Sequence, residues 1–413
     1  MAHLNRHRAE RLLSDAGLDA LILLAPESFR HATGAEPGVA TMWRRAGAVA
    51  VLVPTDPAIP EAAIVSDLFA DSFRRQSHIT DVRESPIWVE TSILNRADPG
   101  LSPEVLIANA WAAQGRAEGF TRPTTFDPQV CYSHLARALA DRGLASGRIG
   151  IEAAAISASD YPALQSALPA ATLVDASALV ARLKMVKSPA EISALQQAVT
   201  LAERGIGAVR GAIAPGVTRN DLAQVWAGAI KANPDQVRLT GSWEYIAVGS
   251  DPWGGNDAVQ PGDLVKVDVG CLVDGYTSDT GRTFVLGPPS GLQARIHAAL
   301  MQGFVTGSAM LRPGMPLAEV HRATQSAIRA AGFAGYSRGH FGHGLGAGLG
   351  SEEWPFIAAD SAVVIEPGMV LAFECPWYIK GLGGFIIENQ VLIGADGPQV
   401  MNRLPVDLVE VGF

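Results

Sequence analysis

Two acidic side chains eleven residues apart are the first sign of chemistry in this sequence. A β-rich run, Leu264–Val267, ends on Asp268, and Asp274-Gly275 is a residue pair that tight hairpin turns prefer. We predict a second strand from Tyr276 to Val285 that passes Asp279. Because side chains alternate faces along paired strands, the two carboxylates can point at one spot. There they repel each other unless a proton or a cation lies between them.

Three later segments carry further residues of the types that bind metals. His343 stands among glycines, where backbone and ligand can approach closely, and Glu374 and Glu388 are each predicted to end an apolar strand. A carboxylate inside such a strand is costly to bury unless it is paired or bound to a cation. Two aspartates, one histidine and two glutamates suit a pair of divalent ions, and this thiolate-free set favours Mn²⁺, Fe²⁺, Co²⁺ or Zn²⁺.

Taken together, these motifs resemble those of the pita-bread metallopeptidase family, which includes methionine aminopeptidase, aminopeptidase P, prolidase and creatinase. The matching segments come in family order, and the resemblance is close over residues 183–413 and loose over residues 1–180. They are Lys187–Ile192, Ser278–Phe284 (except at Gly281), Gly342–Gly346, Glu366–Val370 ahead of Glu374, and the strand ahead of Glu388.

The resemblance implies a role for each of the five residues. Asp268 would chelate the first metal, Asp279 and Glu388 would bridge both metals, and His343 and Glu374 would hold the second. A bridging water would attack a carbonyl or amidine carbon, and Glu374 would shuttle its proton to the leaving nitrogen. The catalytic candidates are therefore Glu374 and His343, and a homodimer is the expected assembly.

The substrate side departs from the family pattern. Gly350 stands where peptidases of the family carry a substrate histidine, residues 248–255 contain no second one, and Ile386 replaces an arginine. We expect a rebuilt pocket for a short-peptide or small-molecule substrate. One candidate residue is His340, three positions before the metal histidine. The others form an aromatic wall that suits a cationic or ring-shaped substrate: Trp253, Trp354, Trp377 and Tyr378.

One more substrate residue is expected from the N-terminal half of the chain. In creatinase, an arginine ahead of a Gly-aliphatic strand reaches the partner's active site. Arg44 sits in a similar place, ahead of Gly47. We hypothesise that Arg44 binds a substrate carboxylate across the dimer.

The leading functional hypothesis is a two-metal hydrolase of a C–N bond, similar to Xaa-Pro peptidases and prolidases but with a diverged substrate pocket. The alternatives are a creatinase-like amidinohydrolase or amide hydrolase, a metal-dependent dimethylsulfoniopropionate lyase, and a non-catalytic binding module. Gly270 counts against the lyase, because those enzymes carry an extra aspartate at this position. The retention of all five ligand residues counts against the binding module.

Composition limits the class of protein. Charged residues make up 18% of the 413-residue chain, and the net charge of -9 disfavours a nucleic-acid partner. No apolar run approaches the length of a membrane span, and no secretory signal peptide is recognisable. Three widely spaced cysteines indicate neither a disulfide framework nor a zinc knuckle. We expect a cytoplasmic enzyme.

The elements that position these residues divide into two domains. Strands and helices alternate up to about residue 180, which predicts an α/β domain over residues 1–182, of the creatinase N-terminal type by resemblance. Ser188-Pro189 and Glu191 form a strong helix start just after the predicted boundary. Residues 183–413 then read as helices packed on a mainly antiparallel sheet, an α+β pattern that corresponds by resemblance to a pita-bread catalytic domain.

Overall fold

The computed structural model describes residues 4–94, 100–233, 235–253, 255–348 and 352–412. The chain folds into two compact units, residues 1–183 and 184–413. None of the helices in the described ranges is both long and apolar enough to cross a membrane.

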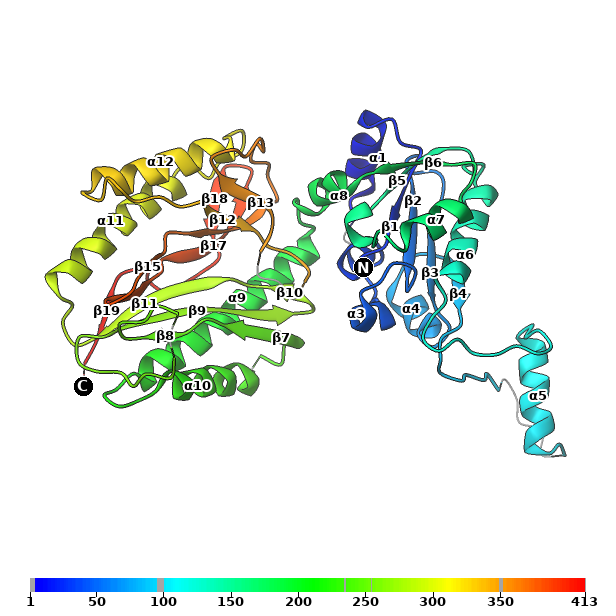
Figure 1. Ribbon diagram of the computed structural model, residues 1–413, viewed down its shortest axis with the longest axis horizontal. Coiled ribbons are helices and arrows are strands. Elements are labelled where there is room, and N and C mark those ends of the chain that lie inside the picture. The colour runs from blue at the N-terminus through cyan, green and yellow to red at the C-terminus, as the bar shows by residue number, and fades with distance from the viewer. Residues whose placement is uncertain (1–3, 95–99, 234, 254, 349–351, 413) are drawn as a thin grey trace. The chain divides into compact units, whose positions relative to one another are not determined.

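The first unit is built on one mixed six-stranded sheet with the order β4-β3-β2-β1-β5-β6 (Figure 1). Its central strands, β1 and β2, are completely buried, as their apolar sequences predict. Its strands are β1 (Ala20–Leu23), β2 (Ala50–Pro54), β3 (Ala62–Ser66), β4 (Asp81–Ser85), β5 (Arg148–Ile151) and β6 (Thr172–Asp175). Its helices are α1 (Arg6–Asp15), α2 (Pro26–Thr33), α3 (Val39–Trp43), α4 (Ala70–Gln76), α5 (Pro103–Ala113), α6 (Pro128–Asp141), α7 (Tyr161–Ala167) and α8 (Ser177–Lys184), with a 3₁₀ turn at Ala153–Ala155.

The second unit contains two larger sheets and a small two-stranded one. The first sheet contains β7 (Leu239–Glu244), β8 (Ala247–Val248), β9 (Leu264–Val273), β10 (Tyr276–Thr277), β11 (Thr280–Leu286) and β19 (Val409–Val411). The second contains β12 (His340–Gly344), β13 (Glu353–Ala358), β14 (Val370–Glu374), β17 (Glu388–Gly394) and β18 (Gly397–Val400), and β15 (Trp377–Ile379) pairs with β16 (Gly383–Phe385). All strand pairs here are antiparallel except β11 with β19.

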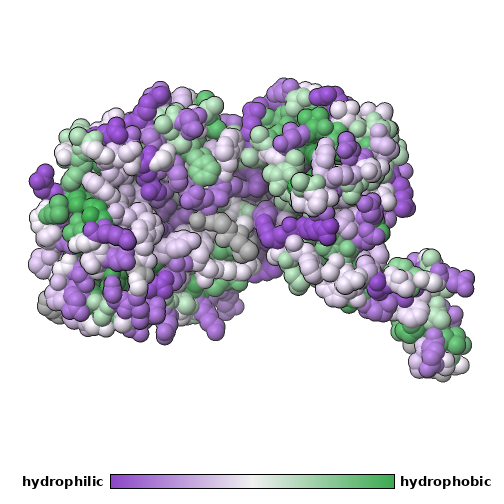
Figure 2. Space-filling view, in the orientation of Figure 1, coloured by the Kyte–Doolittle hydropathy of each residue, from purple (hydrophilic) through white to green (hydrophobic). Residues whose placement is uncertain are grey.

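Four helices cover the sheets of the second unit from outside: α9 (Pro189–Ala212), α10 (Arg219–Ala232), α11 (Gly291–Ser308) and α12 (Leu317–Ala330). Side chains of α9 and α10 form a hydrophobic core with one face of β9, and α11 and α12 form another with β12, β14 and β17. The sheets therefore lie between two helical layers (Figure 1). The visible surface is mainly polar, with small hydrophobic patches (Figure 2). This confirms the expected architecture, an α/β domain followed by an α+β domain.

The predicted hairpin exists, with one break. Asp274 and Gly275 both have positive φ values, 50° and 78°, as the two central residues of a type I′ turn do, and Tyr276 pairs with Val273 across it. The second strand is not continuous, however. It ends after Thr277 and resumes at Thr280, so Asp279 lies in the gap between β10 and β11.

The expectation for Glu388 is wrong in the same way. The apolar strand before it, β16, ends at Phe385, and Glu388 is the first residue of β17. Its cross-strand partner is Glu374, the last residue of β14. In both cases a metal-ligand candidate lies at or next to a strand end, where the backbone departs from the regular pleat.

A buried ion-pair cluster ties the start of the second unit to its second sheet. The Glu353 carboxylate accepts from Lys184 Nζ at 2.8 Å and from Lys187 Nζ at 2.9 Å, and the Lys187 side chain is only 1% exposed. Burial alone would raise the pKa of Glu353, but the two lysines lower it to about 2. Glu353 therefore stabilises the fold fully above its unfolded pKa near 4.5, and this contribution is lost as the pH falls towards 2.

We expect Lys187→Met to lower the free energy of unfolding by about 2 kcal/mol at pH 7, because Glu353 keeps only one cationic partner. The loss should shrink as the pH falls from 4.5 towards 2, where protonation of Glu353 removes the need for either lysine. Urea unfolding across this pH range measures both effects. Lys380→Met, which alters an exposed lysine, is the control. An equal cost for both variants would contradict this role of Lys187.

Candidate metal centre

A cavity of about 280 Å³ lies in the second unit, and all five predicted metal ligands line it. The first sheet supplies Asp268 and Asp279, and the second supplies His343, Glu374 and Glu388. On β9, the odd-numbered residues Val265–Cys271 pack against the helical layer, so Asp268 points to the opposite face. The site therefore lies between the two sheets.

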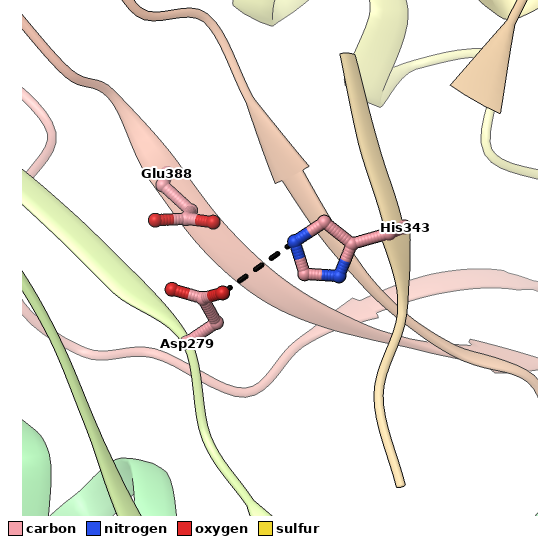
Figure 3. A group of neighbouring side chains, drawn as sticks. All are labelled: Asp279, His343 and Glu388. Atoms are coloured by element: carbon pink, nitrogen blue, oxygen red, sulfur yellow. Dashed lines mark ion pairs between the residues drawn. The ribbon is translucent and has the colours of Figure 1, made fainter. Parts of the chain in front are cut away.

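Three of the five residues form a compact cluster (Figure 3). Potential ligand atoms of Asp279, His343 and Glu388 all lie within 4.8 Å of one another, and all three residues are buried. His343 Nε2 lies 3.5 Å from Asp279 Oδ2, while its Nδ1 lies 3.0 Å from the Gly344 carbonyl oxygen. That second contact fixes the ring so that Nε2 points at the carboxylates, as a metal-binding histidine requires.

The cluster is electrostatically unsatisfied. Asp279 Oδ1 and Glu388 Oε2 are buried and have no hydrogen-bond partner among the described residues. Burial, followed by the charges of Glu388 and Asp268, raises the pKa of Asp279 well above its ordinary value. Burial, followed by the charges of Glu374 and Asp268, does the same for the pKa of Glu388. Orphaned carboxylate oxygens facing an imidazole nitrogen fit a divalent cation.

The other two ligand candidates line the same cavity but contact cations. Asp268 Oδ2 accepts from Lys266 Nζ at 3.3 Å, and Glu374 Oε1 accepts from Arg338 Nη2 at 2.6 Å. Burial raises the pKa of Asp268, although the Lys266 ammonium opposes the shift. The cavity lining thus contains five carboxylates and two cations, which leaves excess negative charge for metal ions to neutralise.

Arg282 connects the two halves of the cluster. Its guanidinium is buried, and it donates to the backbone carbonyls of Gly281 and Glu388 and to Asn389 Oδ1. Gly281 lies two residues after Asp279, so one side chain joins the backbone on both sides of the cluster. Thr283 adds a further link through hydrogen bonds to the backbone of Ile386.

The aromatic wall is only partly as expected. Trp253 lines the cavity and stacks on Tyr378 with ring centroids 4.3 Å apart. Trp354 and Trp377 are not among the described residues that line it. Both pack against the hydrophobic core under α11 and α12, and Trp377 lies 5.0 Å from the ring of Tyr336. Core packing accounts for these two tryptophans.

The remaining residues that the sequence analysis linked to substrate binding lie in different parts of the chain. His340 contacts the site from the side, with Nδ1 3.7 Å from Glu374 Oε1, and burial lowers its pKa. Arg44 belongs to the first unit, where it pairs with Glu27 at 2.7 Å. Gly350 lies outside the described residues. Of the two neighbouring acids that come after it, Glu352 lines the cavity.

Two departures from the family motifs, Gly281 and Ile386, are in contact in the structure. A Cβ atom at Gly281 would lie 2.5 Å from Ile386 Cγ1, closer than any side chain tolerates. A β-branched residue at position 281 is therefore incompatible with Ile386 in this position. The glycine at position 281 therefore makes room for Ile386, the aliphatic side chain that replaces an arginine at position 386.

Five lining residues were not predicted from the sequence: Trp243, Tyr245, Lys266, Arg338 and Glu352. Lys266 has a recognisable signal, since it lies two residues before Asp268 and so shares its face of the strand. Arg338 and the two aromatic residues, whose rings lie 5.5 Å apart, come from segments that carry no motif. The pairing of β7 with β9, which places Trp243 opposite Gly270, brings the two aromatic residues to the cavity, and Arg338 comes from the segment just before β12.

Comparison with known proteins matches both units to described families. Residues 193–395 match metallopeptidase family M24, and residues 6–186 match the creatinase/prolidase N-terminal domain. The Xaa-Pro dipeptidase of Lactobacillus helveticus is 30% identical over 265 residues, which are 62% of this chain and 71% of the relative. The probable dipeptidase PepE of Mycobacterium tuberculosis is 32% identical over 238 residues, 56% of this chain and 62% of that protein.

Solved structures show the same fold over nearly the whole chain. An Xaa-Pro dipeptidase from Bacillus anthracis superposes with a TM-score of 0.75 at 23% identity, covering 98% of this chain and 99% of that one. The dipeptidase PepE from Mycobacterium ulcerans gives a TM-score of 0.74 at 25% identity, covering 99% and 97%. The two-unit architecture is therefore shared with these dipeptidases.

We expect Asp279→Asn to abolish tight binding of Mn²⁺, because the neutral amide removes one charge from the compact cluster. Calorimetric titration of the metal-free protein and elemental analysis of the loaded protein measure this loss. Asp274→Asn is the matched control, because it makes the same change in the hairpin turn and asparagine tolerates its positive φ. Equal metal content in the two variants would contradict the assignment.

Proposed function

This chain belongs to metallopeptidase family M24 and is a metal-dependent hydrolase, and from that premise we propose that it uses two divalent metal ions to cleave the C–N bond of an Xaa-Pro-type dipeptide or another small amide. Mn²⁺, Fe²⁺, Co²⁺ and Zn²⁺ all suit the ligand set. Asp268 would hold the first ion, His343 and Glu374 the second, and Asp279 and Glu388 both. The identity of the relatives as dipeptidases supports a dipeptide as the first substrate to test.

The observation that carries the proposal is the unsatisfied cluster of Asp279, His343 and Glu388 between the sheets. Burying two carboxylates that each keep an oxygen without a donor among the described residues costs several kcal/mol, unless a cation binds them. A protein that retained this fold only as a binding module would gain stability by replacing them with apolar residues. Their presence together argues for a catalytic metal site.

When bound, the metal ions would lower the pKa of a water molecule and so supply the nucleophile. The chain would contribute the rest. Glu374 lines the cavity and is held by Arg338, so it is positioned to carry a proton to the leaving nitrogen. The Trp253–Tyr378 pair forms one wall of the cavity, and the cavity volume of about 280 Å³ suits a substrate of dipeptide size or smaller.

The lyase alternative is disfavoured by the space around Gly270. A Cβ atom at this position would lie 2.3 Å from the Ser278 carbonyl oxygen and 2.4 Å from the Trp243 ring. Backbone and a half-buried ring cannot both move to admit an aspartate, so the cavity has no place for the extra carboxylate that such lyases use.

We further propose that the enzyme works as a homodimer in which Arg44 binds the carboxylate of the partner's substrate. Arg44 is half-exposed, and it has a positive φ of 46° at the end of α3. A left-handed conformation is strained for a long side chain and is often retained at functional positions. The ion pair with Glu27 would hold the guanidinium in place before substrate binds.

The first test of the proposed function is proline release from Ala-Pro and Leu-Pro by the Mn²⁺-loaded protein. Glu374→Gln should lower kcat by about 10²- to 10⁴-fold, the usual loss when a general acid–base is removed. The exposed Glu410→Gln is the control and should retain full turnover. Undiminished kcat in Glu374→Gln would refute the role of Glu374, and elemental analysis shows whether metal loss accounts for a decrease.

Arg44→Ala should raise KM for the same dipeptides by about 10-fold or more, because a charged hydrogen bond to the substrate carboxylate is lost. Metal content should stay full. Arg45→Ala removes the neighbouring arginine, which pairs with Asp160, and serves as the control. If KM stays the same in Arg44→Ala, the arginine does not touch substrate.

A further inference from the structure

A buried lysine lies in the cavity with hydrogen-bond donors to spare. The Lys266 side chain is 2% exposed and lines the cavity, and its ammonium carries three N–H groups. In the described part of the chain it makes one hydrogen bond, to Asp268 Oδ2 at 3.3 Å. A buried ammonium with unfilled donors is costly, which indicates that it has a further partner in the working enzyme.

The surroundings hold Lys266 in one position. A Cβ atom at Gly384 would lie 3.2 Å from Lys266 Cδ, so β16 packs directly on the aliphatic stem. The ammonium lies 5.2 Å from the centroid of the Tyr378 ring and 5.9 Å from that of Trp253. Both contacts are within the range of cation–π attraction, and both rings line the cavity.

The other cation of the cavity, Arg338, donates more hydrogen bonds than Lys266 does. Arg338 donates through Nε to the His340 carbonyl oxygen at 2.7 Å and through Nη2 to Glu374 at 2.6 Å. Lys266, by contrast, shares its one carboxylate with the proposed first metal. Once a metal ion draws on the charge of Asp268, the ammonium is less strongly paired and has more capacity to bind another oxygen.

We propose that Lys266 donates a hydrogen bond to the carbonyl oxygen of the substrate and stabilises the negative charge that develops there, in place of the histidines that this chain lacks. This inference rests on the proposed function. As the water oxygen bonds to the carbonyl carbon, the π pair moves onto the carbonyl oxygen. It returns when the C–N bond breaks, and the leaving nitrogen takes the proton of the attacking water.

The same charge selects the substrate class. A carbonyl oxygen becomes negative during the reaction, so a fixed ammonium beside it lowers the barrier. An amidine is a cation at neutral pH and would be repelled by Lys266 throughout. The structure therefore favours a peptide or amide over a creatine-like amidine.

The test compares Lys266→Met and Lys266→Arg with the wild type, all loaded with Mn²⁺ and assayed on Ala-Pro and Leu-Pro. For Lys266→Met we expect kcat to fall by about 10²- to 10³-fold, as for loss of one oxyanion donor, with KM within about 3-fold of wild type. Lys266→Arg should recover part of the loss. Binding of a phosphinic dipeptide analogue, whose charged oxygen mimics the developing oxyanion, should weaken by a similar factor in Lys266→Met.

Lys187→Met controls for the removal of a buried lysine, since Lys187 is equally buried but pairs with Glu353 outside the cavity lining. Its stability should fall while kcat of the folded, metal-loaded protein stays near wild type.

Four outcomes would overturn the role of Lys266. They are unchanged kcat in Lys266→Met, a rise in KM alone, a decrease explained by metal loss, and faster wild-type cleavage of creatine than of the dipeptides. Failure of the proposed function is distinguishable from these, because the metal-loaded wild type itself would then cleave no peptide or amide.

Discussion

Repulsion between buried carboxylates is the constraint around which the second unit is built. Asp279 and Glu388 each keep an oxygen with no donor among the described residues, and each has a potential ligand atom within 4.8 Å of one on His343. Such an arrangement raises the free energy of the metal-free fold, and the hydrophobic cores on either side must offset that cost. Two separate cores, one under each helical layer, provide the necessary burial. Metal binding would turn the repulsion into attraction.

The two sheets hold the ligand side chains in restrained positions. The ligand candidates come from two different sheets: Glu374 ends β14, Glu388 begins β17, and Asp279 lies in the gap between β10 and β11. Arg282 ties the Gly281 and Glu388 carbonyls together, so the sheets cannot separate without losing buried hydrogen bonds. Catalytic geometry thus depends on the same contacts that hold the sheets together. Lys266 and Arg338 neutralise part of the negative charge in the cavity by pairing with Asp268 and Glu374.

The sequence was sufficient for the features that depend on local pattern. The β-rich run that ends on Asp268 and the Asp274-Gly275 turn predicted the hairpin. The five ligand residue types predicted a two-metal site, and all five residues line one cavity. Local pattern could not reveal which aromatic residues face inward. Trp354 and Trp377 lie near ligands in sequence but pack into the core, whereas Trp243 and Tyr245 reach the cavity because β7 pairs with β9. Strand pairing and core packing decide which aromatic residues face inward, and the periodicity of one strand does not reveal either.

The central claim is that the cavity between the sheets binds two metal ions through Asp268, Asp279, His343, Glu374 and Glu388. Anomalous diffraction from crystals of the Mn²⁺-loaded protein tests it most directly. The account predicts two anomalous peaks in the cavity about 3.5–4 Å apart, the spacing of bridged two-metal sites, with Asp279 and Glu388 contacting both. A cavity without anomalous density, or a single peak held by other residues, would contradict it.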